Sequence, residues 1–255
     1  MKKLERHEKI LKLIASNSSI GVNELCELVE TSHATIRRDL AELEEDGLLE
    51  RYHGGAIISS KRRFEISFNR RSSLHNEEKQ KIAKKALDYL REGDTIILDA
   101  GTTTLHIAKQ LAKNEQHVRI ITNSIAIAQE TAECLDPKVT LLGGNLDWHN
   151  MSTIGLVAIE YLRTLMVDKV FIGANSVDIE RGVFAVDESS AFLNRAMVSS
   201  SRQVIVVCDS SKFQKTASFK SVDLAEIDCL ITDYLLDREI ANKLCKKLNL
   251  VIAGE

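Results

Sequence analysis

Five short apolar stretches of this 255-residue sequence each end in a cluster of small polar residues or glycines. Such clusters combine hydroxyl, amide and carboxylate groups with backbone that can turn tightly, which suits the binding of a small anion and of ligand hydroxyls. The clusters are Asp99, Gly101, Thr102, Thr103 and Thr104; Thr122 and Asn123; Gly143 and Gly144; Gly173; and Asp209, Ser210, Ser211 and Lys212. In an open parallel sheet the carboxyl ends of the strands lie along one edge, so we expect the five clusters to form one binding site.

The residue types in these clusters indicate a ligand that carries an anion and hydroxyl groups. The threonine hydroxyls and the free amides of the helix start after Gly101 suit a phosphate, and Lys212 adds positive charge. Asp99, Asn123 and Asp209 suit sugar hydroxyls. A single cluster has a simpler interpretation, because Ser, Thr and Asp also cap helices and glycines permit loops. The presence of all five clusters favours a binding site.

Two adjacent arginines, Arg37 and Arg38, indicate a second kind of chemistry. They follow Ser32, a favourable helix N-cap, and the predicted helix ends at Gly47. On an isolated helix such arginines form solvated ion pairs with acids such as Asp39. Here the helix is the third of three short helices followed by a hairpin, and such folds place its first turns in the major groove of DNA. An arginine can pair with guanine or bind phosphates. The residues expected at DNA are Ser32, His33, Thr35, Arg37, Arg38, Arg51 and His53.

The N-terminal elements follow from hydrophobic spacing. Apolar residues at helical spacing predict a helix over 5–16 and a second helix that begins near Asn23 as its N-cap. In the third helix, Ile36, Leu40 and Leu43 share the buried face. Strands over 48–52 and 56–58, joined by a turn at 53–55, complete a winged helix-turn-helix domain in residues 1–58. We expect the acids of this domain to lie on the far side from DNA; they are Glu24, Glu27, Glu30, Glu44 and Glu45.

A basic linker is predicted over residues 59–76, because no hydrophobic period is sustained there and residues 61–71 hold five basic side chains against one acid. Over residues 77–255, short apolar strands alternate with helices, which is typical of a parallel sheet covered on both faces. The predicted fold class is therefore α/β, with an N-terminal winged helix-turn-helix domain followed by a larger α/β domain that has a mainly parallel sheet.

Composition limits the other function classes. The net charge is −3 and the first 57 residues hold 8 basic against 11 acidic side chains, so DNA binding must depend on where the charges point. No apolar run approaches the roughly 18 residues of a membrane span, and we expect a cytoplasmic protein. The cysteines and histidines lack the spacing of disulfide or zinc sites, so we expect no metal and no cofactor. Trp148 and His149, in a predicted loop, either close over a ligand or anchor the surface.

Several motifs occur in one order along nearly the whole chain. They are SHATIRRDL at 32–40, RYHGG at 51–55, DAGTT at 99–103, Thr122-Asn123, Gly143-Gly144 and DSSKF at 209–213. Together they resemble the DeoR family of bacterial transcriptional repressors. The resemblance implies a winged helix-turn-helix domain joined to a sensor domain related in fold to ribose-5-phosphate isomerase, which binds a phosphorylated sugar or a related metabolite. It also implies contacts to operator DNA from Thr35, Arg37 and Arg38. The implied effector pocket contains Asp99, Gly101, Thr102, Thr103, Asn123, Asp209 and Lys212.

Two segments depart from the pattern of that family. Many members have Gly-Ala-Asp-Gly where this chain has Gly173-Ala174-Asn175-Ser176, and Gly-Pro where it has Gly155-Leu156. Both segments lie near the expected pocket and bear on the identity of the ligand. The isomerases carry paired aspartates at the end of the fourth strand, where this chain has Gly173 and Ser176. It therefore has no evident group for proton abstraction from a sugar carbon.

The leading hypothesis is a DNA-binding transcriptional regulator with no catalytic residues. It would repress an operon for sugar or polyol use, and a phosphorylated sugar or polyol effector would control its binding to double-stranded operator DNA. A single winged helix binds DNA weakly, so we expect a homo-oligomer, either a dimer or a tetramer. One alternative is an enzyme similar to sugar-phosphate isomerases with a regulatory N-terminal domain. Another is an adaptor whose N-terminal unit binds protein.

Overall fold

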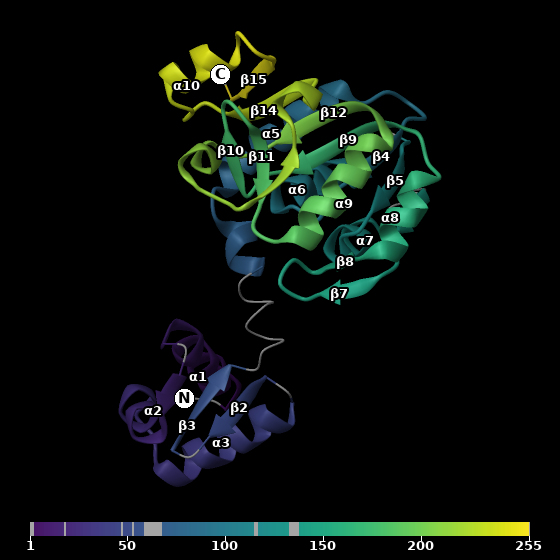
Figure 1. The fold of residues 1–255 in the computed structure, drawn as a ribbon. Coiled ribbons are helices and arrows are strands. Elements are labelled where there is room, and N and C mark those ends of the chain that lie inside the picture. Colours follow the sequence, from purple (N-terminus) through teal and green to yellow (C-terminus); the bar gives the residue numbers. More distant parts are fainter. Residues whose placement is uncertain are drawn as a thin grey trace. The chain divides into compact units, whose positions relative to one another are not determined.

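The computed structural model describes residues 3–17, 19–46, 48–52, 54–58, 68–114, 117–132 and 138–254. The chain divides into two compact units, Met1–Arg70 and Arg71–Glu255 (Figure 1). Gly47, predicted as a helix end, and His53, predicted at DNA, lie outside the described residues, as does the 59–67 part of the predicted linker. None of the described helices is both long enough and apolar enough to cross a membrane.

The first unit packs three helices against a small antiparallel sheet. Its elements are α1 (Lys3–Asn17), β1 (Ser19–Gly21), α2 (Val22–Val29), α3 (His33–Glu45), β2 (Leu49–Tyr52) and β3 (Gly55–Ile58). The strands are ordered β1-β3-β2, and both pairs are antiparallel. Ile36, Leu40 and Leu43 of α3 are buried with Ile10 and Ile14 of α1. The predicted apolar face of the third helix is therefore confirmed.

The sequence interpretation missed one strand in this unit and misplaced one cap. Strand β1 pairs with β3, and its three residues are too few for a hydrophobic period to show. The N-cap of α2 is Gly21, which has no side chain, and the predicted cap Asn23 lies inside the helix. The Asn23 amide oxygen instead lies 2.9 Å from Nε2 of His33 and so joins α2 to the first turn of α3.

The second unit is built on a seven-stranded sheet in which every neighbouring pair is parallel. The strands, in spatial order, are β15 (Asn249–Ala253), β14 (Cys229–Asp233), β12 (Ser201–Val207), β9 (Val167–Gly173), β4 (Thr95–Leu98), β5 (Arg119–Thr122) and β6 (Lys138–Leu141). Val170, Phe171 and Ile172 of the central strand β9 are all completely buried. Because successive side chains of a strand point to opposite faces, both faces of this sheet are covered, as predicted.

The helices of this unit form two packed groups. One group consists of α5 (Asn76–Ala86), α6 (Thr102–Leu111) and α7 (Ile125–Thr131), in which α6 contacts the other two. In the other group, α8 (Leu156–Arg163) packs against α9 (Glu188–Ser199). Helix α10 (Arg238–Leu244) precedes the edge strand β15. Leu162 of α8 and Met197 of α9 share a buried cluster with Val170 and Ile172 of β9.

Two small antiparallel sheets, which the sequence interpretation missed, lie outside the parallel sheet. Strands β7 (Asn145–Asp147) and β8 (Ser152–Ile154) form a hairpin after β6. Strands β10 (Ser176–Asp178), β11 (Gly182–Ala185) and β13 (Phe219–Val222) form the second sheet. Gly144 begins the hairpin at φ +144°, where an added Cβ would lie 2.4 Å from the carbonyl oxygen of Ile154. A side chain at this position would therefore prevent the hairpin from closing.

The structure differs from the predicted linker at its C-terminal end. Residues 71–76, predicted as linker, belong to the second compact unit. Lys79 of α5 holds them in place, because its Nζ donates to the carbonyls of Arg71 at 2.5 Å and Leu74 at 2.7 Å. The second compact unit therefore begins at Arg71, within the predicted linker. A buried lysine that caps backbone carbonyls leaves no hydrophobic period, so the pattern of the sequence could not show this boundary.

Candidate functional site

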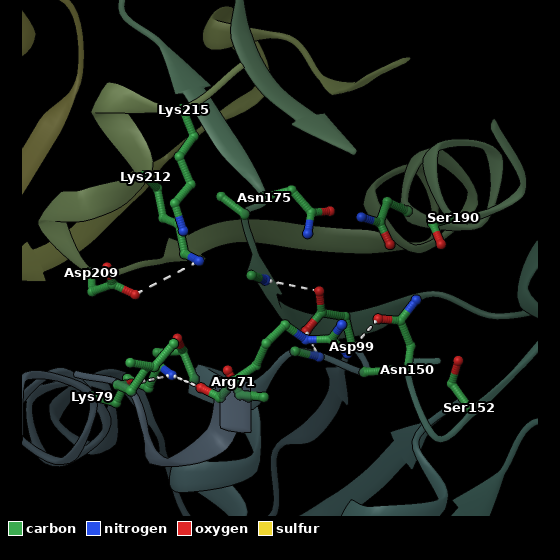
Figure 2. Close-up of a pocket in the computed structure, with 18 of the residues that line it drawn as sticks. Arg71, Lys79, Asp99, Asn150, Ser152, Asn175, Ser190, Asp209, Lys212 and Lys215 are labelled. Atoms are coloured by element: carbon green, nitrogen blue, oxygen red, sulfur yellow. Dashed lines mark hydrogen bonds and ion pairs between the residues drawn. The ribbon is translucent and has the colours of Figure 1, made fainter. Parts of the chain in front are cut away.

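A polar pocket lies at the carboxyl edge of the parallel sheet (Figure 2). The ends of β4, β5, β9 and β12 contribute Asp99, Asn123, Gly173 and Asp209, so four of the five predicted clusters meet there. The other lining residues are Arg71, Leu74, His75, Lys79, Ala100, Gly101, Thr102, Thr103, Asn150, Ser152, Ala174, Asn175, Ser190, Leu193, Asn194, Lys212 and Lys215. The predicted convergence of separate strand ends is therefore present in the structure.

Asp99 is fixed by hydrogen bonds at both carboxylate oxygens. Oδ1 accepts from the backbone N–H of Gly101 at 2.9 Å and lies 2.9 Å from the hydroxyl of Thr104, and Oδ2 accepts from the N–H of Gly173 at 2.9 Å. Burial raises the pKa of Asp99, and these donors oppose the rise. The carboxylate thus joins the end of β4 to the end of β9 and fixes the backbone turn into α6.

Two buried acceptor atoms at the pocket have no hydrogen-bond partner among the described residues: Oδ1 of Asn123 and Oδ2 of Asp209. The Asn123 amide is oriented by its other end, since Nδ2 donates to the carbonyl of Thr153 at 3.0 Å. The other oxygen of Asp209 accepts from the N–H of Ser211 at 3.2 Å and from the Ser211 hydroxyl. A buried acceptor without a partner is costly, and donors on a ligand, such as hydroxyl groups, would satisfy both atoms.

Four basic side chains line the same pocket, with Lys212 and Lys215 on one side and Arg71 and Lys79 on the opposite side (Figure 2). Burial lowers the pKa of Lys79 to about 8, and the neighbouring basic groups add to this effect while Asp209 opposes it. Burial also lowers the pKa of Lys212, whose Nζ lies 4.0 Å from Oδ2 of Asp209. Buried cations that depress one another's pKa favour an anionic ligand, because its charge removes their mutual repulsion.

The structure separates the predicted effector residues into two sets. Asp99, Gly101, Thr102, Thr103, Asn123, Asp209 and Lys212 line the pocket, whereas Thr104, Thr122, Gly143, Gly144 and Ser211 do not. Three of these residues form hydrogen bonds that support the site from outside the pocket. The hydroxyl of Thr104 lies 2.7 Å from the Gly101 carbonyl, and Oγ1 of Thr122 accepts from the N–H of Ser124 at 3.0 Å. The hydroxyl of Ser211 donates to Asp209. The two glycines allow the turn between β6 and β7.

Several pocket residues were missed because their segments carry no strand-end signal. Arg71 and His75 precede α5, and Lys79 lies within it. Asn150 and Ser152 come from the β7–β8 hairpin, Ser190 and Asn194 from α9, and Lys215 follows the short 3-10 helix Ser210–Gln214. Asn175 lines the pocket and Ser176 donates to the carbonyl of Lys215 at 2.8 Å. One departure from the family pattern, Asn175, therefore lies in the pocket wall, and the other, Ser176, contacts a residue of that wall.

The N-terminal unit presents the predicted arginines on α3. Ser32 caps this helix by accepting from the N–H of Thr35 at 3.3 Å, as predicted, and its hydroxyl lies 2.9 Å from that of Thr35. Arg37 and Arg38 are exposed, and neither forms an ion pair within the described part of the chain. Both guanidinium groups are thus available for phosphates or base edges.

The acids next to these arginines pair with helix α1 instead. Asp39 is buried, and it accepts from Nε of Arg6 at 2.5 Å and from Nη2 at 2.9 Å, with Nε2 of His7 at 3.1 Å. Glu42 pairs with Lys3 at 2.7 Å. The ligand atoms of His7, Asp39 and Glu42 are close enough for a metal ion, but Arg6 and Lys3 already neutralise both acids. This network therefore excludes the solvated pairs considered for the arginines.

Arg51 lies in β2 of the hairpin and is paired within the unit. Its Nε lies 2.7 Å from Oε2 of Glu44, and its backbone N–H donates to Oε1 at 3.0 Å. The prediction that Glu44 lies on the far side from the DNA-contact residues is therefore wrong. Glu44, Arg37 and Arg51 line one surface groove, together with Tyr52 and Gly54. Glu44 orients Arg51 there, since a carboxylate can accept from both groups at once.

Family models and known relatives agree with this organisation. Residues 6–62 match the model of a DeoR-like helix-turn-helix domain, and residues 74–234 match that of the DeoR C terminal sensor domain. The chain is 36% identical to the HTH-type transcriptional repressor GlcR of Bacillus subtilis, over 91% of this chain and 88% of that protein. It is 34% identical to the HTH-type transcriptional regulator GlpR of Haloferax volcanii, over 92% of this chain and 91% of that protein. The structural alignment with ribose 5 phosphate isomerase A of Neisseria gonorrhoeae covers 55% of this chain and 55% of that protein, at 17% sequence identity and a TM-score of 0.42.

The sensor match alone covers more than half of the chain, and the relatives align over nearly all of it. The chain therefore belongs to the DeoR family of transcriptional regulators, with an N-terminal helix-turn-helix domain for DNA and a C-terminal sensor domain.

Proposed function

We propose that this regulator represses genes for the use of a sugar or polyol, and that a phosphorylated sugar or polyol in the pocket at the sheet edge controls its binding to operator DNA. The observation that carries the proposal is the composition of the pocket. It combines four basic side chains with two buried acceptors that lack hydrogen-bond partners among the described residues. The basic groups suit a phosphate, and the acceptors suit hydroxyl groups on the same molecule.

The proposed phosphate position is between Lys212, Lys215, Arg71 and Lys79. The N-terminal amides of α6, next to Thr102 and Thr103, add donors for an anion. The hydroxyl groups would then reach Oδ1 of Asn123 and Oδ2 of Asp209. This arrangement distinguishes a phosphorylated polyol from a free sugar, which lacks the anion, and from inorganic phosphate, which lacks the hydroxyl chain.

On the DNA side, we propose that Thr35, Arg37 and Arg38 contact the operator from the first turns of α3, with Ser32 and His33 at its start and Arg51 in β2. His53, outside the described residues, is proposed as a further contact. Two copies of the chain are needed to place two such helices on successive half-sites of a duplex. We therefore propose a homo-oligomer. The proposed organisation is a DNA-reading domain over residues 1–58, a connecting segment, and a sensor domain from Arg71 to the C-terminus.

A gel-shift experiment tests both parts of the proposal. The full chain is titrated onto duplex DNA from the upstream region of its own gene. The titration is done without ligand and with glycerol 3-phosphate, D-ribose 5-phosphate, D-glucose 6-phosphate or D-fructose 6-phosphate. The proposal expects sequence-specific binding that at least one of these compounds changes, and no turnover of that compound. Binding to no duplex at low salt would overturn the DNA assignment, and conversion of a sugar phosphate would favour the isomerase-like alternative.

A further inference from the structure

The chain segment that leaves the DNA-reading unit forms part of the pocket wall. Arg71, Leu74 and His75 all line the pocket, and Arg71 directly follows Arg70, the last residue of the first compact unit. An effector in this pocket therefore touches the start of the connection itself, and not only the edge of the sheet.

The guanidinium of Arg71 is held by the loop between β7 and β8. Nη1 donates to Nε2 of His149 at 2.5 Å, and Nη2 donates to the carbonyl of His149 at 2.6 Å and to Oδ1 of Asn150 at 3.1 Å. Nε2 can accept only from the neutral ring, and burial together with the charge of Arg71 lowers the pKa of His149. These three acceptors are thus uncharged. Burial lowers the pKa of Arg71, and the charge of Asp147 in the same loop opposes this effect. An anion competes well for such a cation, since charge-assisted hydrogen bonds are roughly twice as strong as neutral ones.

A second pocket cation holds the backbone of the same segment. Lys79 is buried, and its ammonium donates to the carbonyls of Arg71 and Leu74. A phosphate that attracts the Lys79 ammonium weakens these two bonds as well. The side chain of Arg71 and the backbone of the segment are therefore held by contacts that the same anion can take over.

The loop that holds Arg71 is firmly attached to the sheet. Thr153 donates its N–H to the carbonyl of Asn123 at 2.8 Å and its hydroxyl to the carbonyl of Leu142 at 2.6 Å, and Asn123 donates to the Thr153 carbonyl. Asp147 accepts from the N–H of His149 at 3.0 Å and from the Asn150 amide at 2.7 Å. When Arg71 exchanges partners, residues 71–75 are thus the part that moves.

Backbone strain lies at both ends of this contact. His75, at the end of the segment, has φ 53°, and Met151, next to Asn150, has φ 50°. Residues other than glycine are strained in this left-handed backbone region, and they adopt it where the surrounding contacts hold them there. Loss of the Arg71 contact removes part of what holds the segment, so the strain at His75 favours its movement.

We propose that Arg71 couples the effector pocket to operator binding. The anion of the effector binds the Arg71 guanidinium in place of His149 and Asn150, and this exchange repositions the segment that leads to the DNA-reading domain. The proposal rests on the proposed function, because it requires an anionic effector in this pocket. Its distinctive consequence is that loss of the contact alone, without any ligand, reproduces the effector-bound state.

The test removes the two side-chain acceptors of Arg71, Nε2 of His149 and Oδ1 of Asn150, while leaving Arg71 and the His149 carbonyl in place. The full-length double variant His149→Ala/Asn150→Ala is compared with wild type in ligand-free operator binding by fluorescence anisotropy. We expect its affinity to differ from that of wild type by about 5- to 150-fold, the usual range of allosteric coupling. Hydrogen exchange at residues 72–75 should rise in the variant, and in wild type when 20 mM inorganic phosphate replaces chloride at constant ionic strength.

Arg71→Lys is the second variant, because it keeps the charge and the loop but loses the planar fork that reaches three acceptors. It should show the same ligand-free change, whereas the exposed control Arg202→Ala should behave as wild type. Wild-type operator affinity and wild-type exchange in folded Arg71→Lys, or in the folded double variant, would overturn the coupling role. Failure of the proposed function gives a different result, in which wild type responds to none of the four sugar phosphates.

Discussion

The hydroxyl of Thr104, inside helix α6, lies 2.9 Å from Oδ1 of Asp99, at the end of strand β4. Thr104 is completely buried and does not line the pocket, but it fixes a carboxylate that does. Its hydroxyl is also 2.9 Å from the carbonyl of Asp99 and 2.7 Å from that of Gly101. Thr104 therefore shapes the site through the turn between β4 and α6.

Thr104→Val removes this hydroxyl while keeping the shape of the side chain. A buried carboxylate then loses one donor, and we expect the free energy of unfolding to fall by about 1–3 kcal/mol. Urea denaturation of the full chain measures the loss, with exposed Thr216→Val as the matched control. Equal losses in both variants would show that the contact to Asp99 contributes nothing.

Arg37→Ala combined with Arg38→Ala should abolish specific operator binding and leave ligand-induced thermal stabilisation unchanged, because these arginines lie in the N-terminal unit and the pocket lies in the other unit. Each lost phosphate contact should also reduce the dependence of log affinity on log salt by about 1. Anisotropy titrations at several salt concentrations measure both effects, and exposed Lys9→Ala is the control. Retained operator affinity in the double variant would place the reading surface elsewhere.

The affinity of the pocket for an anion should fall as the pH rises above about 8. The pKa of Lys79 is lowered to about 8, so its positive charge is present at pH 7 and largely lost at pH 9. Loss of a cation weakens the binding of phosphate, and the lowered pKa of Lys212 acts in the same direction. Calorimetric titration with D-ribose 5-phosphate at pH 7 and pH 9 tests this. Lys79→Met should reduce the difference between the two pH values, whereas exposed Lys84→Met should preserve it.

The stability of the N-terminal unit should decrease in acid. Burial acts to raise the pKa of Asp39, but the hydrogen bonds from Arg6 and His7 outweigh it and lower the pKa. A carboxyl group with a lowered pKa in the folded state stabilises the fold above its ordinary pKa of about 4, and this stabilisation is lost as the pH falls further. Thermal unfolding of wild type and Asp39→Asn from pH 7 to pH 3 measures the effect. The difference between the two proteins should shrink toward pH 3.

The sequence predicts best where one physical signal repeats. The strands of the parallel sheet are short, buried on both faces and strongly apolar, and Ile36, Leu40 and Leu43 follow a clear helical period. The small strands β1, β7 and β10 have three residues each, which is too short for a period to appear. The strand-end clusters supplied eight of the 21 residues that line the pocket. The sequence interpretation missed Arg71, Lys79 and Asn150, because only the folding of distant segments brings them to the site. The segment around Arg71 also has the composition of a solvated basic linker.

The position of Arg71 has a consequence for building hybrid regulators. A graft that joins a foreign DNA-reading domain at residue 77, where the change of sequence pattern lies, discards an arginine that lines the pocket and the two carbonyls held by Lys79. A graft joined after Arg70 keeps all three. Hybrids made at the first junction should fold and yet respond poorly to ligand, whereas those made at the second should inherit the switch.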